Sequence, residues 1–164
     1  MIRKFLIITC CLFLLFISCT QENKSIQLNK FYETEFYSIK YPSGWNSALY
    51  SELSEDTLCL TSNNGKHNIL CIKMNGRIPL PSYKEAVVLF ESLYCDSLIE
   101  KQKEPVIING TEFCILKYKE YDICRKVYIT HISRTGLSYC VQNIYSTKQE
   151  EEIGDSIIHT IVFK

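Results

Sequence analysis

The chain has 164 residues, with 18 Lys and Arg against 18 Asp and Glu, and a formal net charge of zero. The two signs are interspersed, which argues against nucleic acid or an anionic lipid surface as an electrostatic partner. The chain contains 11 Tyr and 8 Phe and many β-branched residues but very few alanines, so its composition favours strands.

The first 18 residues predict a removable signal peptide. Arg3 and Lys4 form a short positive region, and an apolar run follows from Phe5 to Ile17. This run is about 13 residues long, whereas a membrane-spanning helix needs roughly 20. The run is therefore too short to remain as a membrane anchor.

The segment Phe16-Ile17-Ser18-Cys19 resembles the lipobox of bacterial lipoproteins, in which a cysteine thiol accepts diacylglycerol. The resemblance implies signal cleavage between Ser18 and Cys19 and lipidation, including palmitate-type acyl chains, at Cys19. Each buried CH₂ contributes about 0.8 kcal/mol, so two or three chains hold a soluble domain at a membrane. The alternative is an ordinary secretory signal that is cut at a nearby small residue.

The residues after the anchor bear on location. Residues 20–24 contain no Asp next to the cysteine, which argues against retention in the inner membrane. They also contain no run of acids, which argues against export to the cell surface. We therefore expect a protein of the cell envelope, anchored in the outer membrane and facing the periplasm.

Length limits the domain organisation. Removal of 18 residues from the 164 leaves 146, which is enough for one domain with a core and too few for two. We expect a lipidated N-terminus and tether over residues 19–32 and a single domain over 33–164. We also expect a monomer that binds neither nucleic acid nor a cofactor.

Six cysteines remain once the signal peptide and Cys19 are set aside. An even count in an exported domain suggests disulfides, although six cysteines allow fifteen connectivities. Cys59 and Cys71 lie almost equally far from Gly65 in a predicted hairpin, so they are a possible cross-strand pair. The alternative is that these thiols are small buried apolar residues. No Cys-x-x-Cys occurs, which argues against a zinc ribbon or a thioredoxin-like site.

The predicted elements of the first half are strands followed by a helix. Alternation predicts strands over 36–41 and 45–50, followed by the Cys59 hairpin. Prolines then break the pattern, and Ser82 is a candidate helix cap with Glu85 three residues later. Apolar residues three to five positions apart predict a long amphipathic helix from Tyr83 to about Lys103.

The second half returns to strands. Asn109-Gly110 predicts a type I′ hairpin turn, and Ser146-Thr147 with three following glutamates predicts a helix start. The strands expected around them cover residues 106–108, 111–118, 125–133, 137–145 and 159–163. The whole order predicts an α+β fold, an antiparallel sheet of about six to eight strands covered by one long central helix and a short C-terminal helix.

The segment Ser38-Ile39-Lys40-Tyr41-Pro42-Ser43-Gly44-Trp45 resembles the opening of PsbP-like domains, a group that includes the photosystem II extrinsic subunit and the DcrB lipoproteins. The chain end, Asp155 to Phe163, resembles their closing helix and strand. The resemblance implies a PsbP-like α/β/α sandwich in which the motif is structural and carries no active site. The motif residues so implied are Tyr41, Pro42, Gly44 and Trp45.

Candidate chemistry is sparse. His67, His131 and His159 share no metal-ligand spacing, so we expect no metal site. Cys140 and His131 lie on adjacent predicted strands, which is the single hint of a thiol nucleophile. Glu150-Glu151-Glu152 fits a solvated helix start better than a cation site.

These observations favour a non-enzymatic, membrane-tethered lipoprotein that binds or helps assemble another envelope protein or complex. The first alternative is a small-ligand or glycan-binding module, which would have a concave pocket lined by tyrosines. The second is an unrecognised hydrolase, which would have a cleft where a histidine meets a carboxylate or thiol. The tyrosines in question, which otherwise pack in the sheet, are Tyr118, Tyr121, Tyr128, Tyr139 and Tyr145.

Overall fold

The computed structural model describes residues 26–50, 57–74, 98–102 and 104–164, together with positions 84, 85, 87, 88 and 91. Ser18 and Cys19 lie outside these residues. The described chain forms eleven strands and the helix α3 (Lys148–Ile158).

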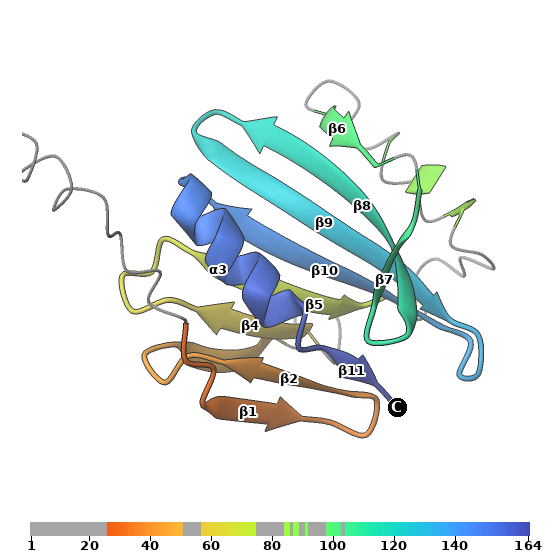
Figure 1. The fold of residues 1–164 in the computed structure, drawn as a ribbon, viewed down its shortest axis with the longest axis horizontal. Helices are drawn as coiled ribbons and strands as arrows, with labels where there is room; N and C mark the ends of the chain where they lie inside the picture. The colour runs from red at the N-terminus through yellow and green to blue at the C-terminus, as the bar shows by residue number, and fades with distance from the viewer. Residues whose placement is uncertain are drawn as a thin grey trace, which may run out of the picture.

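Most of the strands form one large antiparallel sheet (Figure 1). Seven of its eight strands run in the order β3-β4-β5-β10-β9-β8-β6, and the eighth, β7, pairs with β8. They are β3 (Asn46–Tyr50), β4 (Thr57–Thr61), β5 (Asn68–Lys73), β6 (Leu98–Lys101), β7 (Val106–Ile108), β8 (Thr111–Glu120), β9 (Ile123–Ile132) and β10 (Leu137–Tyr145). A small sheet has the order β1-β2-β11, with β1 (Lys30–Glu33), β2 (Tyr37–Tyr41) and β11 (Val162–Phe163).

The hairpin turns follow from local sequence. Asn109 and Gly110 have φ of 49° and 77°, which is the left-handed pair that a type I′ turn requires. They join β7 to β8 with Ile108 opposite Thr111, as the sequence predicted. Gly136, at φ 68°, closes the β9–β10 turn in the same left-handed region.

One face of the large sheet, here called the inner face, carries Tyr128, Tyr139 and Val141. The helix α3 and the small sheet lie over this face (Figure 1). Tyr139 packs against Tyr37 of β2 at 5.9 Å and Phe163 of β11 at 4.6 Å between ring centroids. The inner face is therefore the main core of the protein.

The opposite, outer face has a second apolar cluster. Cys114, Ile129 and Cys140 are buried there, and Val87 packs with them. Positions 84, 85, 87, 88 and 91 have helical backbone, and Val87 lies against the outer face.

The α+β fold with a long central helix, and with it the α/β/α sandwich that the PsbP resemblance implied, is wrong, because the domain is β-rich. Residues Leu98–Lys101 form β6, which pairs with β8, so a helix from Tyr83 to Lys103 is not formed. The step from Leu93 to Leu98 is five residues, which departs from the helical period, and an aliphatic pair then continues as an edge strand. The remainder of that prediction lies largely outside the described residues.

The short C-terminal helix is present as α3. Thr147 caps it in a capping box with Glu150, and Ile157 and Ile158 are buried in the main core. At the other end, the first strand of the described chain, β1, begins at Lys30.

Candidate functional site

The Tyr41–Trp45 motif forms a turn between the two sheets. The Trp45 amide donates to the Pro42 carbonyl at 3.0 Å, and the Trp45 ring is buried in the main core. A Cβ on Gly44 would lie 2.9 Å from the side chain of Asn63. These contacts are packing contacts, and they link the end of β2 to the turn between β4 and β5.

The structure does not bring Cys59 and Cys71 together. The register places Cys59 opposite Leu70 and Cys71 opposite Leu58. Directly opposed residues share a face and successive residues alternate, so the two thiols lie on opposite faces of the sheet. Both are buried free thiols, and burial raises the pKa of Cys71 to about 12.

His131 and Cys140 do not form an activated pair. His131 Nδ1 lies 3.0 Å from the hydroxyl of Ser138, the residue directly opposite it. Burial raises the pKa of the Cys140 thiol to about 12, so it is protonated at neutral pH and is a poor nucleophile. Among the described residues, no three His, Cys, Asp or Glu side chains are placed to hold a metal ion.

The five tyrosines named above do not gather into an exposed patch. Tyr121 is 91% exposed at the β8–β9 turn. The other four named above are buried in the sheet. Their burial fits the packing role rather than a tyrosine-lined surface.

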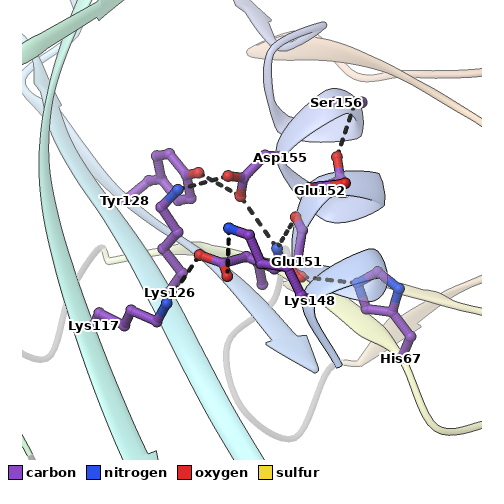
Figure 2. Close-up of polar contacts among 10 residues, drawn as sticks. His67, Lys117, Lys126, Tyr128, Lys148, Glu151, Glu152, Asp155 and Ser156 are labelled. Atoms are coloured by element: carbon purple, nitrogen blue, oxygen red, sulfur yellow. Dashed lines mark hydrogen bonds and ion pairs between the residues drawn. The ribbon is translucent and has the colours of Figure 1, made fainter. Parts of the chain in front are cut away.

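The glutamates at the start of α3 are only partly solvated. Glu151 is buried, and its carboxylate oxygens lie 3.1 Å from Lys117 Nζ and 3.2 Å from Lys148 Nζ (Figure 2). Burial raises the pKa of Glu151, but the hydrogen bonds from the two lysines outweigh it and leave the pKa below its ordinary value. Glu150 instead caps the helix by accepting from the backbone of Thr147.

A second carboxylate of α3 is held by the inner face. Asp155 accepts from Lys126 Nζ at 2.6 Å and from the Tyr128 hydroxyl at 2.7 Å (Figure 2). Burial and then the neighbouring Asp155 charge raise the pKa of Tyr128, so its hydroxyl remains a donor. A hollow of about 150 Å³ lies beside these pairs. Its lysines, Lys117 and Lys126, already pair with carboxylates of α3, so we interpret the hollow as part of the packing of α3 and not as a ligand site.

Asn143 connects this network to His67, which directly precedes β5. Its Nδ2 donates to the Glu151 carbonyl at 3.0 Å, and its Oδ1 lies 2.8 Å from His67 Nε2. Because Oδ1 only accepts, His67 carries its proton on Nε2. Burial lowers the pKa of His67, and the ring packs edge-on against Trp45 at 4.7 Å.

The candidate ligand site lies at the other end of the large sheet. It is an open pocket of about 330 Å³ between the β7–β8 turn, the β9–β10 turn and β11. Asn109 ties these parts together, since its Nδ2 donates to the carbonyls of His159 and Ile161, both at 2.8 Å. The lining residues are Asn109, Gly110, Thr111, Glu112, His131, Ile132, Ser133, Arg134 and Phe163.

The charged side chains of this pocket differ in their pairing from those beneath α3. The ion pairs found in the described part of the chain include neither Glu112 nor Arg134. One unpaired carboxylate and one unpaired guanidinium thus line the same pocket, together with His131. This site was not expected from the sequence, because its members come from two hairpins and β11, which are distant in the chain and meet only in the folded protein.

No protein-family model matches the chain. A comparison with curated proteins likewise finds no significant match. The resemblance to PsbP-like domains therefore rests on segments 38–45 and 155–163. No helix within the described residues is long and apolar enough to cross a membrane.

Proposed function

We propose that this protein is a lipid-anchored lipoprotein of the cell envelope whose domain binds or helps assemble another envelope protein or complex. The observation that carries the proposal is the placement of Cys19, directly after a signal-like segment and eleven residues before β1 at Lys30. An extended chain spans at most about 3.6 Å per residue, so the tether keeps the domain within roughly 40 Å of the membrane. Acylation at Cys19 would supply the attachment.

The anchoring is tested by metabolic labelling with an alkyne fatty acid. We expect label on the wild-type protein and none on Cys19→Ala, with wild type in the outer-membrane fraction of a density gradient. Cys11→Ala is the matched control, because it removes a cysteine from the apolar run and keeps the acceptor. Unlabelled wild-type protein would overturn the anchoring.

The binding role is tested by cross-linking in native membranes. Capture of the wild-type protein and of the Cys19→Ala form, compared by mass spectrometry, should enrich a specific envelope protein only with the lipidated form. If neither form enriches a protein, the assembly role fails while the anchoring result still stands.

A second candidate function, small-ligand binding, is favoured by the pocket between the β7–β8 and β9–β10 turns. Glu112 and Arg134 line this pocket with opposite charges, and neither belongs to an ion pair within the described residues. A zwitterion such as an amino acid or dipeptide would pair its ammonium with Glu112 and its carboxylate with Arg134. The pocket contains one aromatic residue, Phe163, and no tyrosine, which fits a zwitterion better than the tyrosine-lined glycan site considered above.

Calorimetric titration with glycylglycine and with a neutral disaccharide tests this candidate. We expect binding of the dipeptide alone, weakened about tenfold by Arg134→Ala, since a charge-assisted hydrogen bond is worth about 1.5 kcal/mol. Lys119→Ala, an exposed change at the opposite end of β8, should leave the affinity unchanged. Equal affinities for Arg134→Ala and wild type would remove the candidate.

A further inference from the structure

The strand β3 is an open edge of the large sheet. Within the described residues it is bonded on one side only, to β4. All five of its side chains are exposed, including Leu49 at 61% and Tyr50 at 47%. An open edge presents a row of backbone donors and acceptors, so β3 offers both hydrogen bonds and apolar contacts to an added strand.

The other sheet edges carry features that oppose pairing. The edge strand β6 carries Glu100 and Lys101 and has a register irregularity. The edge strand β1 carries Lys30 and Glu33, whereas β7, which is bonded only to β8, and β11 are just three and two residues long. Charges, irregular register and short length are the usual protections of an edge, and β3 has no charge, proline or bulge.

The geometry points to antiparallel pairing of β3 with β3 of a second copy of this chain, centred on Ala48, which joins the two large sheets into one. In this register Ala48 faces the partner's Ala48, Ser47 faces the partner's Leu49, and Asn46 faces the partner's Tyr50. All five residues are neutral, so no like charges oppose each other. This pairing depends on the proposed anchoring only for its local concentration, and it replaces the monomer expected from the sequence.

The symmetry of this pairing suits a tethered protein. The twofold axis of a self-paired antiparallel strand is perpendicular to the sheet, so the inner faces of both copies point the same way. The small sheet, in which β1 follows the tether, lies over the inner face in each copy (Figure 1). Both tethers therefore leave from the same side and reach one membrane.

The size of the contact sets its strength. A stable interface buries at least about 1,200 Å², which a pair of five-residue strands does not reach. Pairing in dilute solution is therefore weak. Two copies confined to a membrane meet at an effective concentration near the millimolar range, where weak pairing is populated.

Disulfide trapping tests the pairing in the full-length, lipidated protein. Ala48→Cys places a thiol at the twofold centre, where opposed Cβ atoms lie about 4.5 to 5.5 Å apart, within reach of a disulfide after small adjustments. We expect a reducible species of twice the protomer mass after mild oxidation of membranes. Ile107→Cys, at a 75% exposed position on β7, is the matched control, and wild type reports on the native thiols.

A second variant tests the apolar contact. Leu49→Lys in the Ala48→Cys background puts two charges on the paired edge, and the exposed position should allow normal folding. We expect the trapped fraction to fall at least fivefold. An unchanged fraction would overturn the register.

The outcomes separate this inference from the proposed function. Trapping no greater than for Ile107→Cys, or trapping onto a different polypeptide, overturns self-pairing whether or not Cys19 is acylated. If the protein is not acylated, the anchoring fails, and self-pairing is then judged by the same trapping on purified protein at about 1 mM. A dimer at that concentration supports self-pairing without anchoring.

Discussion

The side chain of Asn143 occupies the space that a Cβ on Gly154 would fill. Asn143 is fully buried on β10, and Gly154 lies on the buried side of α3. The absence of a side chain at residue 154 therefore allows the helix to approach the sheet closely enough for Asn143 to reach the Glu151 carbonyl.

We expect Gly154→Ala to lower the free energy of unfolding by about 2 kcal/mol, because overpacking a filled core typically costs 1 to 3 kcal/mol. Alanine is otherwise the better helix former by about 1 kcal/mol, so the sign of the change is diagnostic. Urea denaturation measures it. Ser156→Ala, on the exposed side of the same helix, is the control and should stay within about 0.5 kcal/mol. A stabilised Gly154→Ala variant would contradict the close approach.

The ion pair between Glu151 and Lys117 should contribute to docking of α3. Glu151→Ala leaves Lys117, whose side chain is only 25% exposed, without its carboxylate. Because a hydrogen bond to a charged group is worth about 1.5 to 3 kcal/mol and Lys117 retains some solvent, we expect a loss of about 1 to 2 kcal/mol in urea denaturation. Glu152→Ala, one residue away and exposed, should change stability by less than about 0.5 kcal/mol.

His67 should make stability depend on pH. Burial lowers its pKa in the folded state, although Asn143, Glu150 and Asp155 partly oppose the shift. The unfolded state therefore binds the proton more tightly, so stability is full above the unfolded pKa near 6.5 and falls as the pH is lowered below it. We expect the urea midpoint to decrease from pH 7.5 to 5.5.

His67→Gln separates this effect from that of the carboxylates. The variant is less stable at all pH values but should have a flatter dependence between pH 7.5 and 5.5. The pKa values of Glu150 and Glu151 are lowered, so these carboxylates affect stability only near and below pH 4.5. They therefore do not change the slope of stability between pH 7.5 and 5.5. An identical slope for His67→Gln and wild type would rule out His67 as the titrating group.

Sequence patterns predicted the elements that depend on local chemistry. Asn109-Gly110 gave the type I′ turn because both residues tolerate positive φ, and Thr147 with Glu150 forms the capping box at the start of α3. Alternation located most strands, because one face of each is buried.

The sequence was a poor guide wherever partners are distant in the chain. The helix expected from Tyr83 to Lys103 overlaps β6. The residues of β6 form a strand because they pair with β8, which comes later in the chain. The His67–Asn143 contact joins residues 76 positions apart. Gly154 is a local signal for the close approach of α3 to Asn143, since a glycine inside a helix often has a packing reason, but it gives no indication of His67.

The cysteines provide the last prediction. Burial raises the pKa of Cys71 and Cys140 to about 12, so almost no thiolate is present at pH 8 and both should resist alkylation in the folded protein. Among the cysteines that the structure describes, Cys124, which is partly exposed, should react first. Iodoacetamide labelling mapped by peptide mass spectrometry measures each site, and unfolding in urea should make all of them reactive. Rapid labelling of Cys140 in the folded protein would instead indicate an accessible thiolate beside His131 and would support the hydrolase alternative. A disulfide-linked Cys59–Cys71 peptide would contradict the placement of these two thiols on opposite faces of the sheet.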